Sequence, residues 1–204
     1  MRGIAAFLML FFACVLCAGV LNDTVSIVYD SPDYDIFLRD MARLQDIDQK
    51  KVVLSGKGIS GKRLLFRRHD IVEGVDSVSE IPYSIRLNGD SVAIYFNVRR
   101  VNADSVLVLL DGPFLTYFGL KMNAAGHILL ETNLDKPSVV GDTIPLIAYS
   151  AGVVSEFMYS GNVAQSMDYC ELRNANLHPL EWMKKYGIDD FFYYDVIFIP
   201  RKEQ

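Results

Sequence analysis

The segment 87–92, LNGDSV, is echoed fourteen residues later by the segment 101–106, VNADSV. In both segments an Asn-x-Asp-Ser turn leads into a strand-like run, and residues of these types favour tight turns. Parallel strands need a crossover of about a dozen residues, usually helical, so turns this close together predict antiparallel pairing. Two copies are too few for a repeat protein, and we interpret them as the entries of two adjacent strands.

Similar runs extend from this stretch in both directions, and turn residues separate nearly all of them. The candidate strands are 24–29, 51–54, 64–67, 83–87, 92–98, 106–110, 115–118, 127–131, 144–149, 153–158 and 193–199. The run 106–110, VLVLL, lacks polar alternation, which predicts a strand covered on both faces, in the middle of a sandwich or beneath a helix.

Two amphipathic helices are expected on either side of these strands. The first has Ser31 as its N-cap and Pro32 at the first helical position, and it ends near Ile47. Its apolar stripe is predicted to pack against the core and consists of Tyr34, Phe37, Leu38, Met41 and Leu44. A shorter helix spans 179–186, where Gly187 stops it. The fold class predicted is α+β and β-rich, an antiparallel sheet or sandwich with one N-terminal helix and one short C-terminal helix.

The beginning of the chain has the layout of a secretory signal peptide. An apolar run from Ile4 to Leu21 follows the single charge of Arg2, and small residues at 17–19 favour cleavage after Gly19. Two alternatives stay open, an uncleaved membrane anchor and lipidation of a cysteine in this run. We expect residues 1–19 to be a signal peptide and the protein to be exported, periplasmic or extracellular, with signal anchoring to the membrane as the alternative.

Residues 20–204 are expected to form a single β-rich domain, because about 185 residues bury enough surface to fold without covalent staples. Cys170 is the only cysteine outside the predicted signal peptide, so the domain has no internal disulfide, which favours a bacterial envelope protein. The net charge of −5 argues against a nucleic acid partner. Membrane contact is expected only through the N-terminal segment, if it is uncleaved.

The segment 56–62, GKGISGK, resembles the G-x-x-x-x-G-K part of a phosphate-binding loop, and Asp111 follows an apolar run as the magnesium-binding aspartate of such proteins does. However, Arg63 occupies the place of the Ser or Thr that binds magnesium, and 64–66 has the pattern of a strand instead of a helix. We therefore favour a glycine-rich loop between strands. No cofactor is predicted.

Two weak binding sites are proposed from composition. Lys62, Arg63, Arg67 and Arg68 fall in a basic stretch and are candidates for binding a sulfate, phosphate or uronate group, or else face water along a strand edge. Trp182 and Tyr186 belong to an aromatic cluster that could stack on sugar rings, pack in the core or contact another protein.

No catalytic residue is predicted, because the sequence has no nucleophile elbow and Cys170 has no recognisable base nearby. His69, His127 and His178 lie far apart without the short spacing of metal ligands, so no metal site is predicted. Whether the protein is an enzyme stays open, with the balance towards no. The expected function is an exported, non-catalytic binding or interaction module for an anionic ligand, a glycan or an envelope protein; the alternative is a secreted hydrolase with no recognisable motif.

Overall fold

The computed structural model describes residues 24–31, 35–134 and 136–199. The predicted signal peptide, 1–19, and Pro32 and Tyr34 of the predicted first helix lie outside these residues. Within them, no helix is both long enough and apolar enough to cross a membrane.

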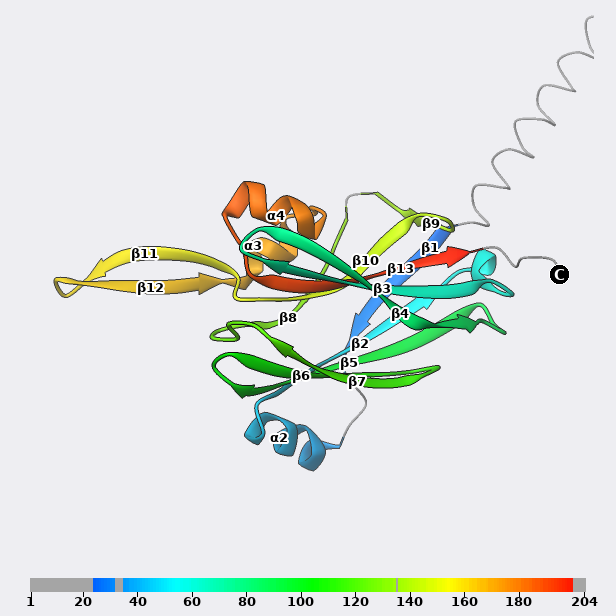
Figure 1. Ribbon diagram of the computed structural model, residues 1–204, viewed down its shortest axis with the longest axis horizontal. Coiled ribbons are helices and arrows are strands. Elements are labelled where there is room, and N and C mark those ends of the chain that lie inside the picture. The colour runs from blue at the N-terminus through cyan, green and yellow to red at the C-terminus, as the bar shows by residue number, and fades with distance from the viewer. Residues whose placement is uncertain (1–23, 32–34, 135, 200–204) are drawn as a thin grey trace, which may run out of the picture.

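Two antiparallel sheets form the body of the protein (Figure 1). The first sheet has six strands in the order β7-β6-β5-β2-β1-β9, with β1 Thr24–Asp30, β2 Ile47–Ser55, β5 Ser91–Asn102, β6 Ser105–Asp111, β7 Leu115–Lys121 and β9 Ser138–Val139. The second has five strands in the order β4-β3-β13-β10-β8, with β3 Arg63–Val72, β4 Val75–Arg86, β8 Ile128–Glu131, β10 Thr143–Ser150 and β13 Phe191–Ile199.

The predicted antiparallel, β-rich fold class is confirmed. Each predicted strand overlaps an observed one, and the strands that follow the two Asn-x-Asp-Ser turns, β5 and β6, are neighbours as expected. The two turns nevertheless connect different elements. The turn after Leu87 joins the second sheet to the first, whereas the turn at Asn102 joins two strands of the first sheet. In the second turn the Asn102 side chain accepts hydrogen bonds from the Asp104 amide and the Ser105 hydroxyl, each at 2.9 Å.

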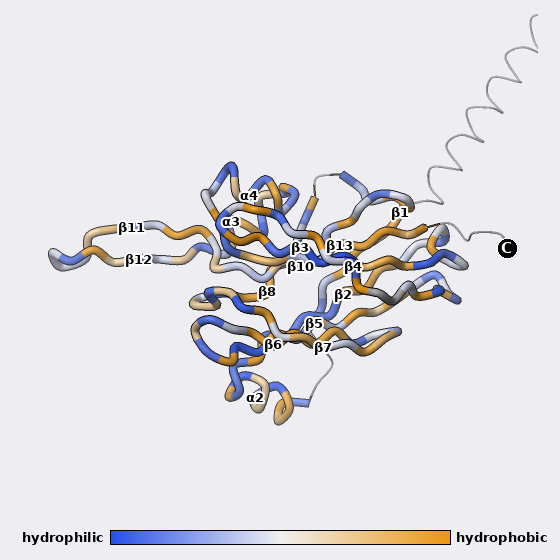
Figure 2. The backbone as a smooth tube through the Cα atoms, viewed as in Figure 1, coloured by the Kyte–Doolittle hydropathy of each residue, from blue (hydrophilic) through white to orange (hydrophobic). Residues whose placement is uncertain are grey.

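The main core lies between the two sheets. Alternate side chains of each strand point inward, so that Ile94 and Phe96 of β5 meet Phe66 of β3 and Phe198 of β13, all fully buried. Figure 2 shows apolar residues recurring along these strands.

A second core covers the outer side of the five-stranded sheet, beneath α3 Tyr169–Asn174 and α4 Pro179–Tyr186. The predicted C-terminal helix is confirmed as α4: His178 caps its start, and Gly187 ends it in the left-handed conformation with φ 68°. The helix α3 was not predicted. Because the second core adds a layer, the central strands β10 and β13 are buried on both faces.

The prediction of a doubly covered strand at 106–110 was wrong. Val106, Val108 and Leu110 of β6 are buried, but the alternate residues Leu107 and Leu109 are only half-buried. The covering helices lie over the five-stranded sheet and not over β6, so the strands with full double burial are those of the other sheet.

The helix α2, Ile36–Leu44, also differs from its prediction. Its N-cap is Asp35, whose carboxylate accepts a hydrogen bond from the Leu38 amide at 2.8 Å, and it ends at Leu44, so that Ile47 already belongs to β2. None of its residues is buried, and Phe37 and Leu44 are 68% and 82% exposed. The helix lies against β2, where Gln49 donates a hydrogen bond to Asn97 at 2.9 Å, so the surface beneath it is partly polar.

The glycine-rich segment 56–62 is a loop between strands, as favoured, with a short 3-10 turn at Lys57–Ile59 and the strand β3 directly after it. Ile59 is fully buried and anchors the loop in the core. A Cβ atom at Gly56 would lie 2.4 Å from the carbonyl oxygen of Thr24, so glycine here permits close backbone packing against β1.

A hairpin of β11 Val153–Tyr159 and β12 Asn162–Asp168 projects from the body, and we call it the arm (Figure 1). The strand β12 was not predicted. The arm continues β10 at Gly152, where φ is +81° and a Cβ atom would lie 2.8 Å from the Tyr169 ring. At its base the Tyr169 hydroxyl donates a hydrogen bond to the carbonyl oxygen of Gly126 at 2.5 Å.

Candidate functional site

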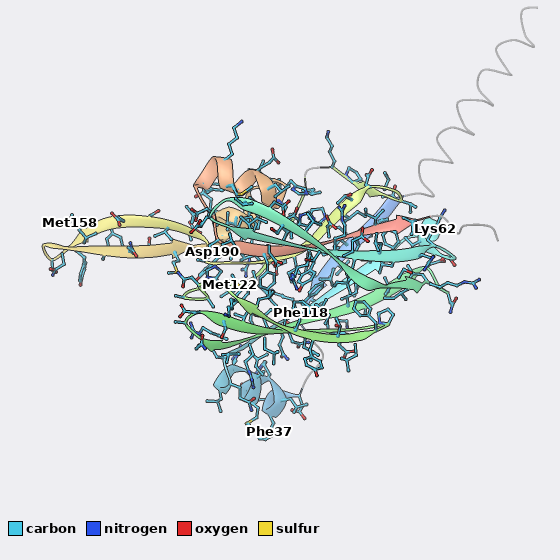
Figure 3. The ribbon with its side chains drawn as sticks, in the orientation of Figure 1. Phe37, Lys62, Phe118, Met122, Met158 and Asp190 are labelled. Carbon is cyan, nitrogen blue, oxygen red and sulfur yellow. The ribbon has the colours of Figure 1, made fainter. Side chains whose placement is uncertain are left out.

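The four basic residues predicted to bind an anion do not form one surface. Lys62 lies in the turn before β3, at the end of the molecule marked in Figure 3, and Arg63 begins that strand. Arg67 and Arg68 are consecutive strand residues and point to opposite faces of the sheet. The Arg68 guanidinium pairs with Asp70 at 2.7 Å and lies 4.6 Å from the centre of the Phe118 ring, between the two sheets.

Arg67 belongs to a buried polar cluster on the other face. Its guanidinium donates two hydrogen bonds to Asp195, of 2.9 and 2.7 Å, and Asp195 is fully buried. His69 lies between two carboxylates, with Nε2 3.0 Å from Asp195 and Nδ1 3.0 Å from Asp76. The polar groups of this cluster are therefore engaged with one another.

Trp182 and Tyr186 do not form a platform for a sugar. Trp182 is 1% exposed and packs in the second core, 5.8 Å between ring centres from Phe191. Tyr186 is half-buried, with the Lys185 ammonium 4.9 Å from its ring centre. For Trp182 the packing interpretation is the one that fits the structure.

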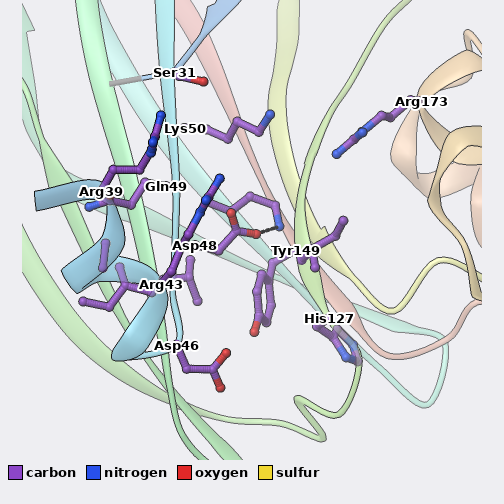
Figure 4. Close-up of a pocket in the computed structure, with 15 residues that line it drawn as sticks. Ser31, Arg39, Arg43, Asp46, Asp48, Gln49, Lys50, His127, Tyr149 and Arg173 are labelled. Carbon is purple, nitrogen blue, oxygen red and sulfur yellow. Dashed lines mark hydrogen bonds between the residues drawn. The ribbon is translucent and has the colours of Figure 1, made fainter. Parts of the chain in front are cut away.

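A cleft of about 460 Å³ lies between α2, the first half of β2, β8 and the end of α3 (Figure 4). Its lining includes four cationic side chains, Arg39 and Arg43 from α2, Lys50 from β2 and Arg173 from α3. We call these the cleft cations. Arg39 and Arg43 share one helix face because they are four residues apart.

The cleft cations differ in how firmly they are paired. Lys50 and Arg173 both contact Glu131, at 2.5 and 3.0 Å. Burial alone would raise the pKa of Glu131, but the hydrogen bond from Lys50 and the charges of Lys50 and Arg173 hold this pKa below its ordinary value. Among the residues that the structure describes, the ion pairs of Arg39 and Arg43 are long contacts with exposed Asp40, at 3.8 and 4.0 Å, and exposed pairs of this kind are weak.

Asp48 and Tyr149 also line the cleft. The Asp48 carboxylate accepts a hydrogen bond from the Leu129 amide, and burial raises the pKa of Asp48 above its ordinary value. Burial, with the nearby charge of Asp48, raises the pKa of Tyr149 to about 12, so its hydroxyl keeps its proton near neutral pH.

His127, another residue of the cleft wall, has both ring nitrogens close to backbone carbonyl oxygens, 3.1 Å from Ala125 and 3.0 Å from Asp190. Both ring nitrogens of His127 are therefore engaged by the backbone. Across residues 24–31, 35–134 and 136–199, no three His, Cys, Asp or Glu side chains are arranged to hold a metal ion.

The cleft was not predicted, although part of its signal was present in the sequence. Arg39 and Arg43 stand four residues apart on a predicted helix, and Lys50 lies at the start of the basic stretch. Arg173 carried no such signal, because it lies on the short helix that the sequence did not reveal.

No family model matches this sequence, and comparison with curated proteins and with solved structures finds no match either. The functional proposal for this chain therefore depends on the chemistry of its cleft.

Proposed function

We propose that the protein is an exported, non-catalytic binding module that holds an anionic group of its ligand in the cleft beside α2. The observation that carries this proposal is the convergence of four cationic side chains on one concavity of about 460 Å³. The ligand group would be a sulfate, a phosphate or a carboxylate such as that of a uronate sugar. Export is proposed from the signal-peptide pattern of residues 1–19.

Arg39 and Arg43 are the residues best placed to engage such a group. Their side chains are 55% and 72% exposed, so a ligand can reach them without opening the fold. A guanidinium offers paired donors that match the oxygens of a carboxylate, sulfate or phosphate. A ligand oxygen can replace the long contacts to Asp40 at small cost, because those contacts are weak.

The other two cleft cations, Lys50 and Arg173, are held in place by an ion pair. Lys50 and Arg173 converge on Glu131, which holds both side chains at the cleft. Figure 4 shows Arg39 and Arg43 on the α2 side of the cleft and Arg173 across from them. The Tyr149 hydroxyl is an additional hydrogen-bond donor of the lining.

Binding without catalysis is favoured by the state of the acid–base groups in the cleft. A hydrolase needs a base that can reach a substrate or a water, and the two nitrogens of His127 already face carbonyl oxygens.

Retention on a sulfated resin tests the proposal. The double variant Arg39→Ala/Arg43→Ala is expected to elute at a clearly lower salt concentration than the parent, because charge-dependent retention is screened by salt. The control variant Lys62→Ala/Arg63→Ala removes the same number of charges outside the cleft and should elute close to the parent. Equal shifts for both variants would mean that retention depends on overall charge, and the cleft proposal would then be wrong.

Retention on the sulfated resin should also strengthen as the pH falls and the Asp48 carboxylate takes up a proton. Ionised Asp48 repels an anion, and its raised pKa means that it loses this charge at a higher pH than an ordinary aspartate. Glu131, with its lowered pKa, stays charged over the same range. In Asp48→Asn the corresponding step in salt-dependent elution should disappear; the same pH profile in both proteins would contradict a role for Asp48.

A further inference from the structure

The arm exposes apolar side chains on both of its faces. Figure 2 shows hydrophobic residues along both of its strands. The exposed apolar residues of the arm are Val154, Phe157, Met158, Tyr159, Val163 and Met167. The arm is therefore an apolar surface that none of residues 24–31, 35–134 and 136–199 covers.

A two-stranded hairpin of this kind is marginally stable in water unless a further strand or a helix packs on it. Glu156 and Gln165 form one cross-strand hydrogen bond of 3.1 Å. The body contacts the arm at its base, through α3 and its first residue, Tyr169. In the described part of the chain, β11 and β12 form a sheet of two strands without a third.

In the same chain, the helix α2 has an apolar face that is not buried. Four apolar residues of α2 are exposed, namely Ile36, Phe37, Leu38 and Leu44, and none of the helix residues is buried. An amphipathic helix gains most of its stability by packing its apolar face against another element. The helix α2 therefore offers the apolar helical surface that the arm needs.

The charges of the two surfaces are complementary as well. Between Val153 and Asp168 the arm has the acids Glu156 and Asp168 and no Lys or Arg. The helix α2 has two arginines, Arg39 and Arg43, against one acid, Asp40. An acidic, apolar hairpin thus matches a basic, apolar helix.

The two surfaces cannot meet within one copy of the chain. Met158 on the arm and Phe37 on α2 lie on widely separated parts of the molecule, and the arm extends away from the body (Figures 1 and 3). A second copy has no such restriction. Each copy has one arm and one α2, so two copies can cover both surfaces reciprocally.

We propose that the arm of one copy packs on the exposed apolar face of α2 of a second copy. The contact is made by apolar side chains of α2 and of the arm, and its test by cross-linking is separate from retention on the sulfated resin. Val154, Met158, Val163 and Met167 share one face of the arm with Glu156 and supply its apolar anchors. On this face Glu156 would lie opposite a helix that carries Arg39 and Arg43.

Site-directed cross-linking in cells that make two differently tagged full-length chains tests the proposal. One chain carries Met158→Cys and the other Phe37→Cys, both in a Cys170→Ser background, and a short bis-maleimide is added. We expect a cross-linked product that contains both tags, well above the background of the parent pair without new cysteines. Adding Val154→Glu, on the same face of the arm as Met158, should lower the yield about tenfold, the loss typical of removing one buried anchor.

Leu115→Glu is the matched control, because Leu115 is an exposed apolar residue of β7 outside both surfaces, and it should leave the yield unchanged. Circular dichroism of each purified variant shows whether it is folded. Cross-linking confined to copies that both carry Met158→Cys would mean that arms pair with each other and would overturn the proposal. No product above background from folded chains would overturn it as well.

Discussion

Replacing Asp195 with alanine should lower the free energy of unfolding by about 3–5 kcal/mol, the usual cost of removing one partner of a buried ion pair. Asp195 is fully buried in the doubly covered strand β13, and its carboxylate is the shared acceptor for Arg67 and His69. Without it, the Arg67 guanidinium and the largely buried His69 ring lose their shared acceptor. Chemical denaturation followed by circular dichroism measures the loss.

Asp76 provides the control for this prediction. Its carboxylate contacts the other nitrogen of His69, but its side chain is 26% exposed, so water can replace it. Asp76→Ala should therefore cost clearly less than Asp195→Ala. If the two variants are equally stable, the burial of Asp195 does not determine the stability of the cluster.

Trp182→Ala should lower the free energy of unfolding by a similar amount, about 3–5 kcal/mol, because it deletes a large buried aromatic side chain. Trp182 is the largest side chain of the second core and attaches α4 to the outer side of the five-stranded sheet. The cavity left behind should loosen α4 before the main core unfolds, which hydrogen exchange of residues 179–186 can detect.

Tyr186→Ala is the comparison, because Tyr186 lies on the same helix but is only half-buried. It should cost less than about 1.5 kcal/mol, as expected for an aromatic ring that stays partly in water. Salt-dependent retention on the sulfated resin should be unchanged in both variants. A Trp182→Ala protein of normal stability but weakened retention would instead support a binding role for this residue.

The strands could be predicted because alternating apolar residues and turn residues are local properties of the sequence. The element that each face of a strand or helix contacts, in contrast, depends on residues far away in the sequence. The α2 periodicity predicted an amphipathic helix correctly, but it could not show that the surface under the helix is partly polar at Gln49 and Asn97. For the same reason the run VLVLL at 106–110 predicts a strand covered on both faces, but only one face of β6 is fully buried. The strand buried on both faces is β13, which has Asp195 in its middle.

The buried cluster shows the same limit for side-chain sites. Arg67 and Asp195 are 128 residues apart in the sequence and become neighbours only because β3 pairs with β13 in one register. Pairing partners of distant strands cannot be read from one sequence. The cleft likewise combines α2, β2, β8 and α3, and only its contribution from α2 and β2 had a visible pattern.

The order of the five-stranded sheet has a consequence for biosynthesis. The strand β13 joins β3 to β10 at the middle of the sheet, yet it follows the other four strands in the sequence. Until the ribosome has made residues 191–199, the nascent chain holds two separate strand pairs, β4 with β3 and β10 with β8, and Arg67 and His69 lack their shared acceptor. The five-stranded sheet can therefore become continuous only after β13 has been made.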